Sequence, residues 1–128
     1  MILDTSAILA IVFREPEEHE FTRKIGSAPT VGIGAPTLVE TMIVVAARLG
    51  PKAQPLLSGL LERGGIIVVS FEPPHVQVAI EAWQRFRRGR HPAGLNFGDC
   101  LAYATARLAG RPLLCKGEDF SMTDLTLA

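Results

Sequence analysis

Short apolar runs alternate along the chain with longer segments in which apolar residues recur at helical spacing. The short runs predict strands at residues 2–3, 30–33, 66–69, 112–115 and 125–127. The longer segments, bounded by proline and glycine, predict helices at residues 7–13, 15–24, 36–49, 53–63, 73–86 and 98–109. Strands that alternate with helices in this way predict an α/β domain with a mainly parallel sheet and helices on both faces.

Three segments carry a more specific expectation about burial. Residues 66–69 are four β-branched residues in a row, which predicts a strand covered on both faces. Residues 36–49 are apolar almost all round, which predicts a buried helix. Within residues 73–86, one apolar stripe recurs at helical spacing and comprises Val76, Ile80, Trp83 and Phe86.

Composition narrows the class of protein without naming a function. The 128 residues carry 13 basic and 13 acidic side chains, and the mean hydropathy is +0.26. These values fit one globular domain over residues 1–128 and exclude a wholly disordered chain. No segment is long and apolar enough to predict a membrane span, and the apolar start lacks a basic leader, so a cytoplasmic location is expected. Because the net charge is zero, any binding of nucleic acid requires a local basic patch.

Four acidic residues fall at the edge where open α/β sheets bind ligands, beyond the carboxyl ends of the strands. Asp4 ends the first strand, Asp99 opens the helix at 98–109, and Asp119 follows the strand at 112–115. Glu40 lies in the first turns of the helix at 36–49 and is the only charge there before Arg48. A lone buried carboxylate costs several kcal/mol unless a positive group neutralises it. Glu40 is therefore expected to have a partner.

Each acid except Glu40 also has a simple structural explanation. Asp4 and Asp119 could accept hydrogen bonds in turns, and Asp99 could complement a helix dipole. One shared cause accounts for all four acids better than separate accidents do. Clustered carboxylates repel one another, and a hard cation such as Mg²⁺ or Mn²⁺ turns that repulsion into coordination.

The histidines and cysteines predict no zinc site. His19, His75 and His91 fall in helix or loop positions away from the acidic edge. The two cysteines, Cys100 and Cys115, match neither a disulfide framework nor a zinc spacing, and they are expected to be buried free thiols.

Four segments, in order, resemble a PIN-domain ribonuclease, specifically the VapC toxin of a bacterial toxin–antitoxin pair. They are Ile-Leu-Asp-Thr-Ser-Ala at 2–7, Pro-Thr-Leu-Val-Glu at 36–40, Leu-Asn-Phe-Gly-Asp-Cys-Leu-Ala-Tyr-Ala at 95–104 and Leu-Cys-Lys-Gly-Glu-Asp-Phe at 114–120, with Thr-Asp at 123–124. The resemblance implies a three-layer α/β/α fold with a mainly parallel sheet of four or five short strands. It also implies Mg²⁺-dependent endonucleolytic cleavage of RNA, a homodimer and inhibition by a VapB-type antitoxin, while the lack of a long apolar segment predicts no association with membranes.

The same resemblance implies roles for particular side chains. The metal-binding and catalytic acids would be Asp4, Glu40, Asp99 and Asp119. Ser6 would be a supporting hydroxyl, and Asn96 would cap the helix that carries Asp99. Which of Glu118, Asp119 and Asp124 completes the site stays open, and Asp119 is the residue we favour.

The one concentrated basic segment is a candidate RNA-binding surface. It contains Arg85, Arg87, Arg88 and Arg90, with His91 beside them. Cations at the end of a helix also complement its dipole, which is the simpler explanation. Our hypothesis is that these arginines contact RNA phosphates.

Three other functions compete with a metal-dependent ribonuclease. The first is a non-catalytic module of the same fold whose acidic pocket binds a basic partner or a structural metal. The second is an aspartyl phosphatase of the haloacid-dehalogenase type, which needs a second Asp where Ser6 stands. The third is a serine nucleophile, for which no histidine motif supplies an activating base.

Overall fold

A four-stranded parallel sheet forms the centre of the computed structural model, which describes all 128 residues. Its strands lie in the order β3-β2-β1-β4 and are β1 (Ile2–Leu3), β2 (Val31–Gly34), β3 (Ile66–Val69) and β4 (Leu113–Leu114). Every neighbouring pair is parallel, as predicted. Residues 125–127 do not form the fifth strand, since only Leu127 makes an isolated bridge, to Leu113.

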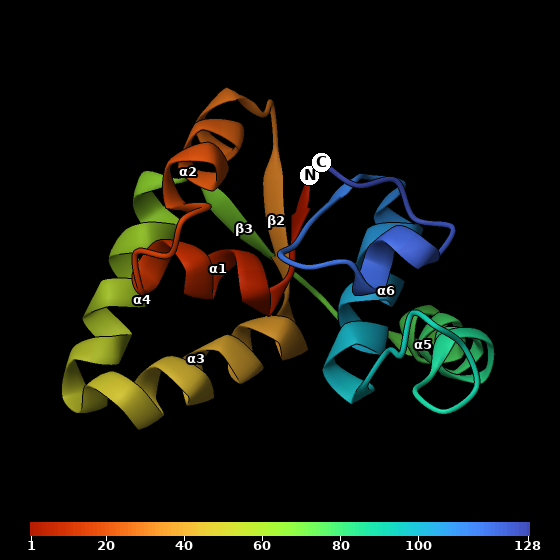
Figure 1. Ribbon diagram of the computed structural model, residues 1–128. Helices are drawn as coiled ribbons and strands as arrows, with labels where there is room; N and C mark the ends of the chain where they lie inside the picture. Colours follow the sequence, from red (N-terminus) through yellow and green to blue (C-terminus); the bar gives the residue numbers. More distant parts are fainter.

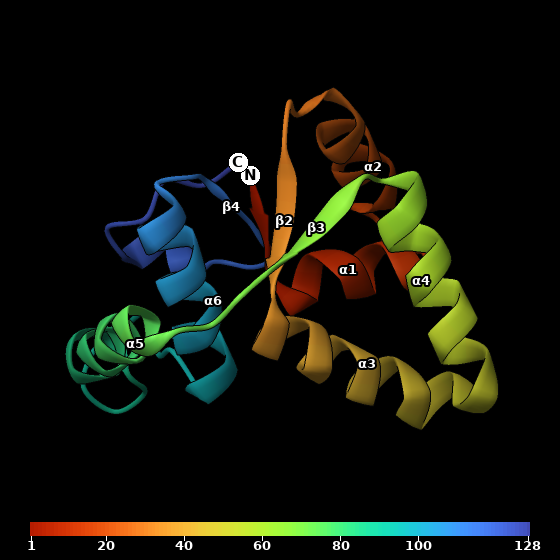
Figure 2. The same cartoon turned by 180° about the vertical axis from the view of Figure 1, so that it is seen from behind.

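Six helices cover the two faces of the sheet. They are α1 (Thr5–Val12), α2 (Glu18–Ser27), α3 (Ala35–Leu49), α4 (Ala53–Arg63), α5 (Pro73–Phe86) and α6 (Phe97–Ala109). Two short 3₁₀ turns, η1 (Gly50–Lys52) and η2 (Asp119–Met122), complete the chain. Helices α1 to α4 lie on one side of the sheet and α5 and α6 on the other (Figures 1 and 2). The predicted three-layer α/β/α architecture is confirmed.

Alternating side chains of β1 and of its neighbour β4 divide the core into two halves. Leu3 and Leu114 belong to the buried cluster beneath α1 to α4. Ile2 and Leu113 belong to the cluster beneath α5 and α6. This alternation is the period of two expected of strands whose two faces are both covered. Because all four strands are parallel, their carboxyl ends lie at one edge of the sheet, where each leads into a loop or a helix.

Predictions of burial were wrong in three places. In β3, Ile67 and Val68 are more than half exposed because this strand lies at the edge of the sheet. In α3 only Thr37, Thr41 and Val45 are buried, so the helix is not buried all round. In α5 the buried residues are Ala79, Ala82 and Phe86, and the other three members of the predicted stripe are about half exposed. Helical spacing identifies an apolar face, but not what covers it.

No helix of the structure has the length and apolar character needed to cross a membrane.

Candidate metal and catalytic site

Asp4 is buried at the point where β1 passes into α1. Its side chain accepts hydrogen bonds from the backbone N–H of Ser6 at 2.9 Å and from the Ser6 hydroxyl at 2.5 Å, so it caps α1. The same hydroxyl oxygen accepts the backbone N–H of Lys116 at 2.9 Å. Ser6 therefore ties the end of β1 to the loop after β4, which carries Asp119.

Asp99 occupies the first turn of α6, where it and Asn96 cap the helix reciprocally. The N–H of Asp99 donates to Asn96 Oδ1, and the N–H of Asn96 donates to Asp99 Oδ2, both at 2.9 Å. The prediction that Asn96 caps this helix is confirmed. One carboxylate oxygen of Asp99 is thus held by the backbone and the other is left for a further partner.

The acids from the different segments share one electrostatic environment. Burial, together with the negative charges of Asp4, Asp119 and Glu40, raises the pKa of Asp99 to about 6, against the hydrogen bond from Asn96. Burial also raises the pKa of Asp4, with a smaller contribution from Glu40, while the Ser6 hydrogen bonds oppose this rise. None of the four acids forms an ion pair, since the nearby Lys116 instead pairs with Glu15 and Glu17. The negative charge at this edge is therefore uncompensated.

The Cys115 thiol, directly after β4, is affected by the negative charges of the same acids. Burial raises the pKa of Cys115 to about 12, and the charges of Asp4, Asp99 and Asp119 add to the rise. Three acids contributed by separate segments therefore act on one atom at the carboxyl edge of the sheet. Both cysteines are free, as expected, but Cys115 is only half-buried. The sequence predicts Cys115 at the end of the strand at 112–115 and indicates no place for it in the acidic site, whereas it directly follows β4 in the structure.

Glu40 reaches this edge from α3. It is half-buried, and its carboxylate lies against Gly98 in the first turn of α6, the residue before Asp99. The expectation that a positive partner neutralises Glu40 is not met within the chain.

Comparison with known proteins now decides the family. A family model for the PIN domain matches residues 1–125. The chain belongs to the PIN-domain family. Ribonuclease VapC36 of Mycobacterium tuberculosis is 43% identical over 126 residues, which cover 98% of this chain and 91% of that protein. Ribonuclease VapC of Mycolicibacterium smegmatis is 37% identical, with 98% and 97% covered.

Solved structures show the same fold. The toxin VapC20 of Mycobacterium tuberculosis, described as cleaving the sarcin-ricin loop, matches with a TM-score of 0.78 at 21% identity, covering 99% of this chain and 97% of that one. VapBC2 of Rickettsia felis, bound to a promoter DNA fragment, matches with a TM-score of 0.73 at 17% identity, covering 99% and 96%. At these identities the likeness concerns the fold of this PIN domain.

The donor set of this PIN domain suits a hard cation. Carboxylate oxygens are the ligands that Mg²⁺ and Mn²⁺ prefer, and the uncompensated charge gives a cation a favourable place to bind. In the side-chain arrangement of the structure, no three acidic, histidine or cysteine side chains form a ready-made metal cluster. Coordination by Asp4, Glu40, Asp99 and Asp119 therefore stays a prediction.

Other predicted site residues lie elsewhere or at the margin. The structure does not bring Asp124 to the acidic edge, because its carboxylate accepts the Tyr103 hydroxyl at 2.6 Å and pairs with Arg85 at 3.2 Å. Asp119 and Glu118 are exposed in and next to η2. Asp124 was linked with the site by the family resemblance and by its nearness to Asp119 in the sequence, and η2 lies between the two residues.

The acidic repulsion predicts how the stability of the metal-free protein depends on pH. The pKa of Asp99 is about 6 in the folded state and about 4 when unfolded, so the folded state binds the proton more tightly. The free energy of unfolding should therefore fall as pH rises from about 4 to about 6. Asp99→Asn keeps an oxygen for the cap and removes the charge. We expect it to stabilise the protein at pH 7.5 by about 1 kcal/mol, after allowance for solvent screening, and to have no effect at pH 4.

Thermal unfolding in the presence of a chelator, at both pH values, measures this difference. Glu62→Gln, on the exposed side of α4, is the control and should leave the melting temperature unchanged. An Asp99→Asn protein that is no more stable than the parent at pH 7.5 would contradict the proposed repulsion.

Proposed function

We propose that this PIN domain is a divalent-metal-dependent endoribonuclease, with Mg²⁺ or Mn²⁺ as its ion, and that it is the toxin of a toxin–antitoxin pair. The observation that carries the proposal is the uncompensated group of carboxylates that four separate segments bring to one edge of the sheet. The names of the relatives, which are ribonucleases, support RNA as the substrate. They do not favour the alternative of a non-catalytic binding module.

The residues of the acidic site would have different roles in phosphodiester hydrolysis. Asp4 and Asp99 would hold the ion, because both are fixed at helix starts by hydrogen bonds. Ser6 would keep the Asp4 carboxylate oriented and would hold the loop of Asp119 against β1. Glu40 would complete the acidic site from α3. A bound divalent ion supplies a water of lowered pKa for in-line attack and stabilises negative charge on the phosphate oxygens.

Two arginines are the best candidates for contact with RNA. Arg85 and Arg87 are not these two, because both already have partners within the chain. Arg85 forms an ion pair with Asp124, and Arg87 stacks over Trp83 and donates a hydrogen bond to the carbonyl of Gln84. Arg88 and Arg90 are exposed and form no ion pair. We propose that these two arginines bind phosphate groups.

The inhibitory partner would use the same acidic site. Two of the neighbouring structures are described as a toxin–antitoxin complex and as VapBC, which supports a VapB-type antitoxin for this chain. A cationic side chain of that partner, an arginine in particular, would neutralise the carboxylates through charge-assisted hydrogen bonds. Such a contact would also exclude the metal ion.

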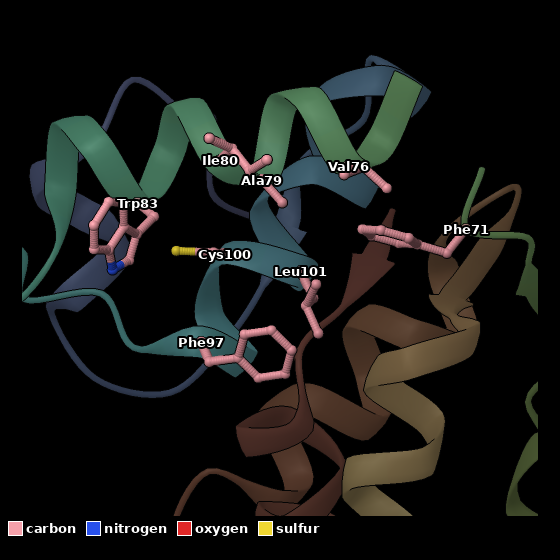
Figure 3. Close-up of a pocket in the computed structure, with 8 residues that line it drawn as sticks. All are labelled: Phe71, Val76, Ala79, Ile80, Trp83, Phe97, Cys100 and Leu101. Atoms are coloured by element: carbon pink, nitrogen blue, oxygen red, sulfur yellow. The ribbon is translucent and has the colours of Figure 1, made fainter. Parts of the chain in front are cut away.

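A continuous apolar face supports the expected homodimer. A groove of about 390 Å³ runs between α5 and α6, with Trp83 at one end and Phe71 at the other (Figure 3). Phe97 and Leu101 also line a second hollow with Val39 and Ile43 of α3, so the two hollows form one surface.

The side chains of this face are exposed and apolar. Its exposed side chains include Phe97, at 79% exposure, and Ile43, at 64%. Val39, Val76, Ile80 and Trp83 are also about half exposed or more, and contiguous exposed apolar side chains of this kind mark protein interfaces. We propose that a second copy of the chain covers this face.

Cleavage of RNA by the antitoxin-free protein tests the catalytic proposal. We expect cleavage with Mg²⁺ or Mn²⁺ and none with a chelator, and Asp4→Asn and Asp99→Asn should each lower the rate at least about 100-fold, because each removes a charge that holds the ion. Millimolar metal should also raise the melting temperature of the parent protein by mass action. Glu62→Gln should cleave normally, and full activity in both Asp variants would exclude these residues from catalysis.

Binding of RNA at increasing salt tests the role of the free arginines. In a protein carrying Asp99→Asn to prevent cleavage, replacing Arg88 and Arg90 with Ala should weaken binding and lower the salt slope by about 1.4, because about two phosphate contacts to single-stranded RNA are lost. Arg63→Ala, on α4 across the sheet, is the matched control. An unchanged slope in the double variant would assign Arg88 and Arg90 a purely structural role.

Light scattering after gel filtration tests the dimer. Ile80→Glu and Ile43→Glu each place a charge in the proposed interface, and both should convert the dimer to a monomer. Ile67→Glu alters an equally exposed apolar residue on β3, away from this face, and should leave the dimer intact. Dimers that persist in both interface variants would contradict the assignment.

A further inference from the structure

Gly98 leaves the space that the Glu40 carboxylate occupies. A Cβ atom built on Gly98 would lie 2.9 Å from Cδ and 3.1 Å from Oε1 of Glu40, and closer still to Oε2. Side-chain carbons in proteins do not approach so closely. Two residues 58 positions apart in the chain therefore meet only because one of them has no side chain.

The backbone of α6 does not itself require glycine at this position. Gly98 is the second residue of the helix and does not have a positive φ. Alanine is the better helix former, so glycine here lowers helix stability. Gly26 provides a comparison: it also lies within a helix, α2, but a Cβ built there would meet nothing within 4 Å. The contact with Glu40 is what distinguishes Gly98.

The side chain that would give way in a Gly98→Ala protein is Glu40. The clashing atoms belong to the end of a long flexible side chain, so rotation of Glu40 relieves the contact without moving either helix. The contact also determines where the negative charge of Glu40 lies. It places the Glu40 charge at the amino end of α6, where the helix dipole favours an anion, against the residue that directly precedes Asp99.

We propose that Gly98 is a positioning residue, whose missing side chain allows Glu40 of α3 to reach the acidic edge next to Asp99 and share a divalent cation with it. This inference rests on the proposed metal-dependent function. It makes Gly98 necessary for the site and dispensable for the fold.

Calorimetric titration of the antitoxin-free protein with Mn²⁺, without RNA, tests the proposal. We expect Gly98→Ala to bind Mn²⁺ at least about 10-fold more weakly than the parent, and Gly26→Ala to bind it normally. Both variants should melt in chelator at or above the temperature of the parent, because alanine favours the helix. In a Glu40→Gln background, Gly98→Ala should cause less than about a twofold further loss, since the carboxylate that it displaces is already absent.

Each contrary result has a separate meaning. Normal Mn²⁺ affinity in Gly98→Ala would overturn the positioning role, as would an undiminished further loss in the Glu40→Gln background. If the parent itself binds no Mn²⁺, the metal-dependent function fails, and a crystal structure of metal-free Gly98→Ala then decides the positioning role. A Glu40 carboxylate turned away from an unmoved α6 supports the role, and an unmoved carboxylate overturns it.

Discussion

Repulsion between buried carboxylates is the interaction on which the acidic site of this structure depends. A parallel sheet delivers the end of every strand to one edge, and in this chain acidic residues follow those ends. Burial and mutual charge raise the pKa of Asp4 and of Asp99, and no lysine or arginine offsets them. The fold holds these groups in an unfavourable state because its hydrophobic layers, packed on both faces, are stable enough to do so. A cation that binds there would relieve this repulsion, because the carboxylates would become its ligands.

Helix capping holds two of the mutually repelling carboxylates in defined positions. Asp4 caps α1, and Asp99 caps α6 together with Asn96. For these two residues capping, the structural explanation, is confirmed, and it is compatible with the proposed metal binding. The backbone N–H groups fix each side chain and partly compensate its charge, while a second oxygen stays open to a ligand. Asp119 has no such cap and is exposed, which suits a more mobile member of the site.

Much of the fold and part of the site could be predicted from the sequence. Short apolar runs located all four strands, and acids directly after those runs located the edge, because the connectivity of parallel strands leaves few alternatives. Burial could not be predicted equally well, since Ile80 in a stripe at helical spacing is indistinguishable from a core residue until its neighbours are known. Asp124 pairs with Arg85 and accepts the Tyr103 hydroxyl, which neither the family resemblance nor its nearness to Asp119 in the sequence indicated. The contact of Glu40 with Gly98 joins distant segments through an absent side chain, and no periodicity reveals it.

The two ends of the chain lie next to each other, at the amino ends of the strands (Figures 1 and 2). The terminal amine donates to the carbonyl of Thr30, and the N–H of Ala128 donates to the carbonyl of Leu113. The acidic edge is at the other end of the same short strands. A tag or tether attached at either terminus would accordingly emerge on the side remote from the carboxylates, and a few-residue linker could join the ends into a circularly permuted protein with its acidic edge intact.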